Sequence, residues 1–194
     1  MTARRRERPL TRAELLDAAL GIVDSEGLAA LTMRRLADAV GVEAMSLYHH
    51  VPNKAVLLDW TVERMRAEMR LPEPLPEDWD GVLEAIFVEY RRILAAHPNM
   101  LPLSARRTDS AGASSLLYLI DQGIPPAAAV ELYQSLVAFT LGFSMLGSPL
   151  IETTWAGLPQ ELAERLGEWS DATFRRTLRI LMEGYRPGAG EETA

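Results

Sequence analysis

Residues 31–58 constrain the fold of this chain more than any other stretch. Thr32 is a good helix N-cap, and apolar residues follow it at helical spacing as far as Val40. Gly41 then lies where this helix must end, because a residue without Cβ adopts a left-handed conformation at the lowest cost. One or two further helical turns are expected over residues 44–50. Two short helices joined by a tight turn that contains glycine form a helix-turn-helix, which places its second helix in the major groove of DNA.

An ordered set of motifs extends this pattern. Leu-Thr-x-Arg-x-Leu-Ala opens the first short helix, Gly-Val forms the turn, Leu-Tyr-x-His-Val lies on the second helix, and Asn-Lys opens the next one. Together these motifs resemble the DNA-binding domain of the tetracycline-repressor family of bacterial transcriptional regulators, over about residues 11–70. The resemblance implies that the partner is double-stranded DNA with a palindromic operator.

The resemblance also implies DNA-contacting roles for individual residues. Contacts with the DNA backbone are implied for Arg34, Tyr48 and Lys54, with Thr32 adding its hydroxyl or its amide. Lys54 suits this role, because its charge opposes the dipole of the helix it opens, while free N–H groups at that helix start attract phosphate. The ring of Tyr48 can also pack within the domain with only its hydroxyl exposed. The implied recognition surface, which reads base edges, comprises Ala44, Met45, Ser46, His49 and His50.

The charge distribution fits a DNA-binding domain joined to an acidic one. Residues 1–70 hold 11 basic and 10 acidic side chains, whereas residues 71–194 hold 9 basic and 17 acidic ones. The local field at the DNA-binding domain matters more to phosphates than the net charge of −7. Five arginines among the first twelve residues form a basic arm, which either touches phosphates or the minor groove or is a solvated terminus.

Helix signals fill the rest of the chain, and the predicted fold class is all-α. Thr11 and Glu14 form a capping box at the start of the first helix, which Gly27 ends. Three prolines between residues 72 and 76 separate a helix-turn-helix domain (1–70, including a linking helix over 53–70) from a helical ligand-binding and dimerisation domain (71–186). The last residues, 187–194, are expected to be disordered. Further helices are predicted over residues 79–96, 113–122, 126–146, 160–166 and 171–185, with a short turn of helix within 100–107.

Two of these helices carry more apolar surface than one core needs, namely those over residues 126–146 and 171–185. Internal packing is one explanation. The other is a homodimer in which the two helices meet their copies across a two-fold axis as a four-helix interface. The resemblance favours the dimer, since two DNA-binding domains read a palindrome. The predicted interface residues are Leu132, Leu136, Phe139, Phe143, Phe174, Leu178 and Leu181.

The second domain resembles the ligand-binding domain of the tetracycline repressor more loosely, over roughly residues 79–146. Pro102 stands where the repressor's metal-binding histidine is expected, and Ile86 and Leu146 replace polar drug contacts. These departures argue against a magnesium–tetracycline chelate and favour a small, largely apolar effector. Ordinary core packing is the alternative for each expected pocket residue, and His97 can equally be a helix-end histidine bonded to the backbone. The expected pocket residues are Trp60, Phe87, Tyr90, His97, Tyr118, Phe139 and Met145.

Other function classes find little support in the sequence. No Gly-rich phosphate loop, His-Glu-x-x-His pair or Gly-x-Ser-x-Gly motif occurs, and cysteine is absent, so we expect no enzyme, no cofactor and a cytoplasmic location. His49 and His50 point about 100° apart on a helix and are unsuited to binding one metal ion. No apolar run reaches the roughly 18 residues of a membrane span. The sequence therefore predicts a ligand-responsive repressor, with a ligand-independent regulator or a helical interaction protein controlled by a protein partner as the alternative.

Overall fold

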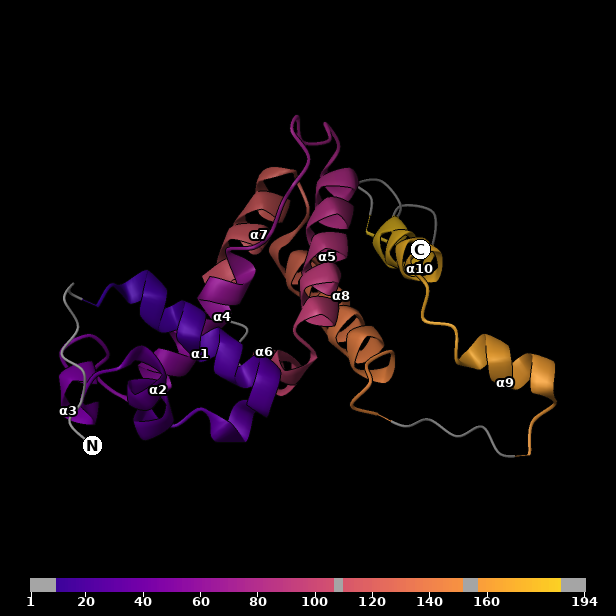
Figure 1. Cartoon of the computed structure of the whole chain (residues 1–194). Coiled ribbons are helices and arrows are strands. Elements are labelled where there is room, and N and C mark those ends of the chain that lie inside the picture. Colours follow the sequence, from indigo (N-terminus) through magenta and orange to yellow (C-terminus); the bar gives the residue numbers. More distant parts are fainter. Residues whose placement is uncertain (1–9, 107–109, 152–156, 186–194) are drawn as a thin grey trace. The chain divides into compact units, whose positions relative to one another are not determined.

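The computed structural model describes residues 10–106, 110–151 and 157–185, with the backbone alone at residues 110–112. Across these ranges the regular structure is entirely helical, which confirms the all-α prediction (Figure 1). The chain divides into two compact units. Unit 1 comprises residues 1–68 and 97–107, and unit 2 comprises residues 69–96 and 108–194. Residues 97–107 were predicted to belong to the second domain, but in the structure they form part of unit 1.

Unit 1 is built around α1 (Arg12–Glu26), which packs against α2 (Met33–Val40) and α4 (Lys54–Arg66). The predicted capping box begins α1, with the Thr11 hydroxyl accepting from the Glu14 amide and the Glu14 carboxylate accepting from the Thr11 amide. The apolar face of α1 is buried over its whole length. The short 3-10 helix η1 (Leu28–Ala30) then leads to α2. This packing makes α1 the support on which the helix-turn-helix rests.

Residues 97–107 contribute two short helices to unit 1. The 3-10 helix η2 (Pro98–Met100) contacts α1, and α6 (Leu101–Arg106) contacts α4. Met100 and Leu101 are fully buried. These buried side chains explain why a segment that follows a helix of unit 2 belongs to the core of unit 1.

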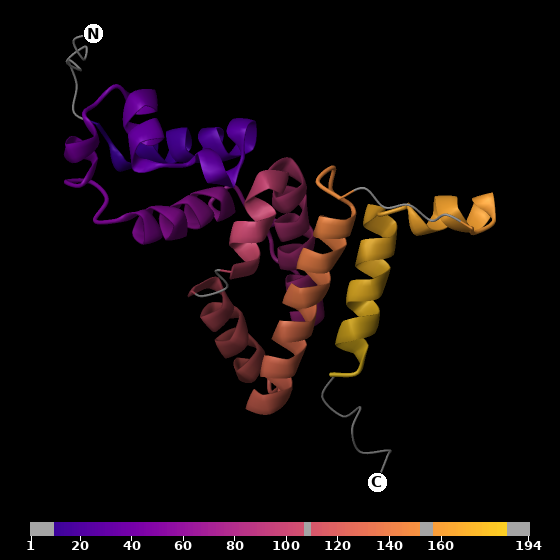
Figure 2. The same cartoon turned by 90° about the horizontal axis from the view of Figure 1, so that it is seen from below.

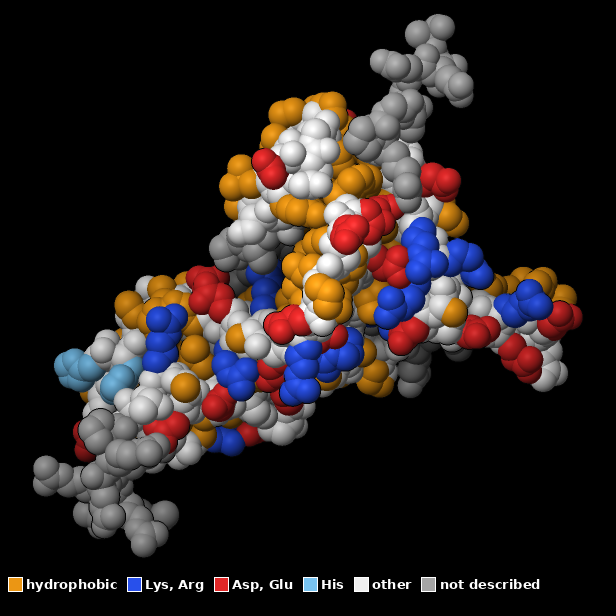
Figure 3. All heavy atoms as spheres, turned by 90° about the horizontal axis from the view of Figure 1, so that it is seen from above, with side chains coloured by type: hydrophobic (Ala, Val, Ile, Leu, Met, Phe, Trp, Pro, Cys, Tyr) orange, Lys and Arg blue, Asp and Glu red, His pale blue; other side chains and the backbone are white. Residues whose placement is uncertain are grey.

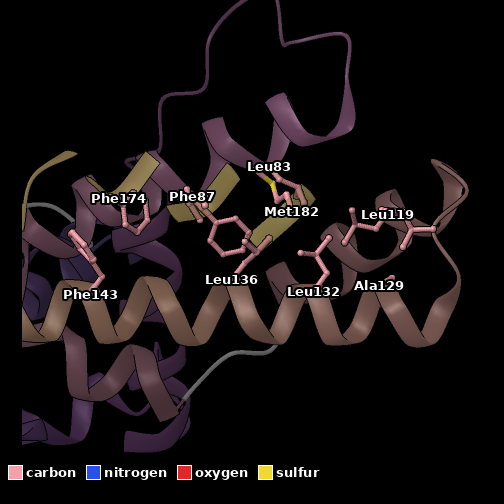
Figure 4. Close-up of a cluster of buried hydrophobic side chains, with 11 residues drawn as sticks. Leu83, Phe87, Leu119, Ala129, Leu132, Leu136, Phe143, Phe174 and Met182 are labelled. Atoms are coloured by element: carbon pink, nitrogen blue, oxygen red, sulfur yellow. The ribbon is translucent and has the colours of Figure 1, made fainter. Parts of the chain in front are cut away.

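Unit 2 is a helical bundle of α5 (Trp79–Ala96), α7 (Ser110–Asp121), α8 (Pro126–Leu146) and α10 (Asp171–Glu183) (Figure 2). Helix α8 lies at its centre and packs against the other three. Leu132 and Leu136 of α8 are fully buried between Phe87 of α5 and Met182 of α10 (Figure 4). Helix α9 (Gln160–Leu166) has no buried residue and stands apart from the bundle in both cartoon views.

An ion-pair cluster joins α10 to α5 at the surface of the bundle. Glu84 accepts hydrogen bonds from Arg179 at 2.7 and 2.9 Å and from Arg175 at 3.2 Å. The bond from Arg179, and then that from Arg175, holds the pKa of Glu84 below its ordinary value. On the same side of α10, Arg91 pairs with Asp171 and donates to the Trp169 carbonyl at 2.7 Å. These contacts fix which face of α10 turns toward α5.

Helix α8 is apolar enough, by length and composition alone, to cross a membrane, contrary to the expectation that no segment reaches this limit. Only 28% of its most apolar 18-residue window is buried within the chain. Its packing against three neighbours is typical of the central helix of a bundle. The rest of this window is partly or fully exposed within one chain.

The predicted helix bounds differ from the observed ones mainly at helix ends. Helix α4 ends at Arg66, four residues before the predicted end, and α10 ends at Glu183 rather than at residue 185. Helix α7 begins at Ser110, before the predicted start at residue 113. The basic-arm residues Arg4, Arg5, Arg6 and Arg8 and the predicted disordered tail 187–194 lie outside the described residues.

Candidate DNA-binding interface and effector site

The helix-turn-helix has the local geometry that its residues predict. The Thr32 hydroxyl accepts from the Arg35 amide at 3.0 Å and so begins α2. Gly41 adopts φ 71°, in the left-handed region, and ends α2. Helix α3 (Ala44–Leu47) follows after two residues, anchored by the fully buried side chains of Leu47 and Val51. The turn and its two anchors hold α3 in one orientation at the surface of unit 1.

The outward side of α3 and the turn after it is exposed, as a recognition surface requires. Met45 is 74% exposed and Tyr48 is 48% exposed, while Ser46, His49 and His50 are also exposed. Ala44 is half-buried. In the space-filling view, histidine side chains (pale blue) and Lys or Arg side chains (blue) lie at the surface of unit 1 (Figure 3). The structure therefore brings the five predicted base-reading residues together on one short segment, and the exposure of Tyr48 leaves its hydroxyl and part of its ring accessible.

Two cations beside this surface have no protein partner. Among the described residues, neither Arg34 nor Lys54 makes an ion pair, and both side chains are exposed. Lys54 is the first residue of α4, and Asn53 caps the same helix by accepting from the Val56 amide at 3.0 Å. Unpaired cations next to the free N–H groups of a helix start are suited to binding phosphate. The predicted backbone contacts Arg34 and Lys54 are thus available for DNA.

The neighbouring Arg35 has a structural role instead. Its guanidinium holds Glu26 of α1 through three contacts of 2.5 to 3.1 Å. The hydrogen bond from Arg35 holds the pKa of Glu26 below its ordinary value. This pair fixes the start of α2 against the end of α1. Adjacent arginines therefore divide into one that supports the motif and one, Arg34, that remains free. Thr32 likewise uses its hydroxyl for capping, which leaves its backbone amide as its means of touching DNA.

Two of the predicted pocket residues, Trp60 and His97, belong to unit 1 rather than to unit 2. The guanidinium of Arg12 lies 3.7 Å from the ring centroid of Trp60, so one face of that ring is covered. The two ring nitrogens of His97 lie within hydrogen-bond distance of two carboxylates. The alternative that the sequence left open was a hydrogen bond to the backbone. Both side chains already have partners within unit 1.

The other predicted pocket residues lie in unit 2. Phe87 and Tyr90 are buried in α5, while Tyr118, Phe139 and Met145 are half-buried on α7 and α8. Burial, with a smaller contribution from Asp78, raises the pKa of Tyr118. Phe139 stacks on Phe174 of α10 with ring centroids 5.2 Å apart. These side chains provide aromatic surface inside the bundle.

Two buried hydroxyls on α8 were missed by the sequence analysis. Thr140 is fully buried and Ser144 is 9% exposed, and neither side-chain oxygen has a hydrogen-bond partner among the described residues. Buried hydroxyls normally have a partner, and a missing one costs about 1–3 kcal/mol. Their spacing of four residues places them on one face of the helix. Two polar residues at this spacing within an apolar helix were the signal that could have identified them.

One pocket in unit 2 is acidic rather than apolar. It is open to solvent, has a volume of about 380 Å³ and lies between α5 and α10. Its lining consists of Asp78, Asp80, Gly81, Glu84, Arg179, Met182 and Glu183, none of which was predicted. No group of three or more His, Cys, Asp or Glu side chains within the described ranges is arranged to hold a metal ion.

Most of the predicted dimer interface is already buried within the chain. Leu132, Leu136, Phe143, Phe174 and Leu178 belong to the core of unit 2, each at most 6% exposed, so these five side chains are already covered within one chain. Phe139 and Leu181 are half-buried. Different apolar residues of these two helices are accessible: Val130 of α8 is 41% exposed and Ile180 of α10 is 62% exposed. Leu141 of α8 is half-buried.

Known proteins similar to this chain share both its motif and its fold. A family model described as bacterial regulatory proteins, tetR family, matches residues 15–59. An HTH-type transcriptional regulator of Saccharopolyspora erythraea is 29% identical over 218 residues, which cover 94% of this chain and 87% of the relative. The HTH-type transcriptional repressor DrrR1 of Streptomyces coeruleorubidus is 31% identical over 181 residues, which cover 90% of this chain and 63% of the relative.

Solved structures extend the similarity to the whole described fold. Apo ActR from Streptomyces coelicolor aligns with a TM-score of 0.76 and 28% identity, covering 96% of this chain and 99% of ActR. The complex of ActR with actinorhodin aligns with a TM-score of 0.73 and 27% identity, covering 94% of this chain and all of ActR. The similarity thus includes both the helix-turn-helix and the bundle.

Proposed function

This chain belongs to the tetracycline-repressor family of bacterial transcriptional regulators, and from that membership we propose that it is a repressor released from a palindromic operator by a small, largely apolar molecule. The observation that carries the DNA-binding part is the exposed face of α3 beside two unpaired cations, Arg34 and Lys54. The side chains of α3 provide base contacts, and the cations provide phosphate contacts that set the register.

The proposed dimer uses the outward face of α8 and α10. Val130 and Leu141 of α8 and Ile180 of α10 form an apolar surface that the core of unit 2 leaves uncovered. Helices α8 and α10 contact each other, and we propose that their outward faces together form one interface. A second copy packed on this surface would bury the apolar side of α8 and bring two helix-turn-helix units to one operator.

The proposed effector site lies in the bundle core around α8. Thr140 and Ser144 offer two unpaired hydroxyls within an environment supplied by aromatic side chains such as Phe139. Binding sites for small molecules combine apolar walls with a few polar groups that fix orientation. ActR, which is similar over its whole length, has been crystallised with actinorhodin. We therefore expect an aromatic effector that carries hydroxyl or carbonyl groups able to satisfy Thr140 and Ser144.

Effector binding would act by shifting a population between two states. Free protein favours the state whose two DNA-binding units fit successive major grooves, and the effector favours another state. An effector with equal affinity for both states would release no DNA, however tightly it binds. The effector must therefore contact groups that differ between the two states.

Two measurements test this function. The affinity for duplex DNA, followed by fluorescence anisotropy, should fall linearly in a plot of log K against log salt concentration, because phosphate contacts release counterions. Binding that does not respond to salt would contradict the proposed contacts. In a thermal-shift series with actinorhodin as the probe, a ligand that binds the native state raises the unfolding midpoint and should also weaken DNA binding. A raised midpoint with unchanged DNA affinity would contradict effector-driven release.

A further inference from the structure

His97 lies between two carboxylates from different parts of unit 1. Its Nδ1 is 2.8 Å from Oδ2 of Asp24, near the end of α1, and its Nε2 is 3.1 Å from Oε2 of Glu68, just after α4. The His97 side chain is only 12% exposed. This arrangement ties three segments of unit 1 together through one imidazole ring.

The chemistry of these groups fixes the protonation state that satisfies both contacts. An ionised carboxylate only accepts hydrogen bonds, and a neutral imidazole donates from one nitrogen only. Both contacts are therefore hydrogen bonds only when His97 is an imidazolium. Imidazole is the side chain that ordinarily exists in both charged and neutral forms, so the two contacts depend on the protonation state of His97.

The charged groups around His97 form a chain of contacts across unit 1. Arg64 of α4 donates to Glu68 at 3.1 Å and to Asp17 of α1 at 2.6 Å. Asn99 donates to the backbone carbonyl of Asp24 at 3.0 Å and holds η2 against α1. The hydrogen bond from His97, with a smaller contribution from Arg64, holds the pKa of Glu68 below its ordinary value. Two acids of α1, one acid and one base at the end of α4, and His97 thus form one network.

The position of this network in the chain gives it a consequence beyond stability. Glu68 is the last residue of the first segment of unit 1, and His97 is the first residue of the second segment. The chain leaves unit 1 directly after Glu68 and returns to it at His97. The hydrogen bond between these two residues therefore joins the exit and the return of the chain. The 69–96 segment of unit 2 is therefore joined covalently to unit 1 at these two residues.

We propose that His97, Glu68 and Asp24 form a clasp that holds the DNA-binding unit in the orientation in which both copies of it in a dimer bind one operator. The clasp is closed when His97 is protonated. The proposal rests on the proposed function in that it requires DNA binding. A closed clasp limits the freedom of the joint between the units. A dimer with closed clasps therefore loses less conformational freedom when both of its DNA-binding units bind one palindrome. Closure of the clasp thus increases the affinity for the full site. Binding to a half-site uses one DNA-binding unit, so the affinity for a half-site does not depend on the freedom of the joint.

The pH window of the clasp follows from its two kinds of group. The lowered pKa of Glu68 means that its contribution is present above the ordinary glutamate value and is lost as the pH falls through the lower, folded-state value. The two hydrogen bonds also require a proton on both ring nitrogens of His97. Closure of the clasp therefore needs an ionised Glu68 together with a protonated His97.

Operator binding tests the positioning role. Affinities for a palindromic duplex and for its half-site, selected from genomic DNA, are measured at pH 6 and pH 8.5 for the wild type, His97→Gln and Glu68→Gln. We expect both variants to bind the full site roughly fivefold more weakly than the wild type at pH 6 and nearly equally at pH 8.5, with half-site affinities unchanged. Glu63→Gln is the matched control, because Glu63 is an exposed acid of the same helix that is 4.0 Å from Arg12, and it should behave as wild type. His49 and His50 are present in every protein compared, so their titration cancels.

The same series contains the results that would overturn the proposal. Identical full-site pH profiles for the wild type and His97→Gln would exclude a role for the imidazolium. Equal losses at the full site and the half-site would show that His97 only supports the fold of the DNA-binding unit. A wild type that binds no duplex at all would refute the proposed function, which is a different outcome from either of these.

Nitrogen NMR tests the chemistry of the clasp without DNA. The chain has three histidines, so His97 is the only one left in a His49→Gln/His50→Gln variant. We expect the Nε2 resonance of His97 at pH 6 to shift when Glu68→Gln is added, because the carboxylate that Nε2 contacts at 3.1 Å is removed. A resonance of His97 that Glu68→Gln leaves unchanged would overturn the clasp.

Discussion

At the scale of single residues, Lys54 is the side chain whose role the structure isolates best. It opens α4, is exposed, and has no ion-pair partner among the described residues. We expect Lys54→Ala to weaken binding to all duplexes and to reduce the slope of log K against log salt by about one unit. Arg176→Ala is a matched control, because Arg176 is an exposed cation on α10 of unit 2, and it should leave the slope unchanged. An unaltered slope in Lys54→Ala would remove this residue from the DNA interface.

Thr140 presents the opposite case, a polar group without a partner inside the core. Thr140→Val keeps the shape of the side chain and removes a buried, unpaired hydroxyl, so we expect it to raise the free energy of unfolding by about 1 kcal/mol. The same variant should bind an aromatic, oxygen-bearing effector more weakly. Chemical denaturation gives the first quantity and ligand titration the second. A loss of stability in Thr140→Val would show that the hydroxyl has a partner in solution.

The residues that the sequence predicted correctly are those whose role is local. Thr11, Thr32 and Gly41 cap or end helices through contacts within a few positions of the chain, and all three behave as predicted. The role of Leu178 depends instead on which side of α10 meets α5 and α8, and it proved to be core. Thr140 escaped notice for a related reason, because the burial of one helix face is a property of the assembled bundle.

At the scale of elements, the outward face of α10 is where the account of the dimer can be tested. Ile180 is 62% exposed, so a charge there disturbs the interior of one chain little, whereas a charge at the fully buried Leu178 would unfold the bundle. We therefore expect Ile180→Glu to yield folded monomers whose affinity for a palindromic operator falls by at least tenfold. Sedimentation measures the first effect and anisotropy the second.

The chain offers a matched control for this change. Leu117 is 67% exposed on α7, and Leu117→Glu introduces the same charge at an exposed apolar residue of a helix outside the proposed interface. It should remain dimeric and bind DNA as the wild type does. Dimers of unchanged stability in Ile180→Glu would move the interface to another face.

Helices themselves were predictable because apolar periodicity, capping residues and prolines act within one element. Helices α5, α8 and α9 occupy the predicted ranges, whereas the end of α4 was placed four residues too late. The error at α4 arose because no strong stop signal precedes the prolines at residues 72–76. The membership of residues 97–107 in unit 1 was not predictable from periodicity, since it depends on Met100 and Leu101 finding a core contributed by distant helices.

At the scale of the whole molecule, the two units carry different parts of the proposed function. Unit 1 presents the recognition side chains of α3 and the unpaired cations, and unit 2 supplies the aromatic core and the uncovered apolar surface of α8 and α10. The link between them consists of chain crossings, two of which are joined by the hydrogen bond between Glu68 and His97. Regulation by an effector requires that binding in unit 2 alter the placement of unit 1, and these crossings are the covalent route.

The central claim is that the chain recognises a specific palindromic DNA sequence through α3. Selection of sheared genomic DNA from the source organism by the purified protein, followed by sequencing of the retained fragments, tests this claim most directly. The account predicts a small set of fragments that share an inverted repeat, whose half-sites are separated by one helical turn or a whole multiple of it. Retention of no fragments in dilute buffer, or of fragments without a shared sequence, would contradict it.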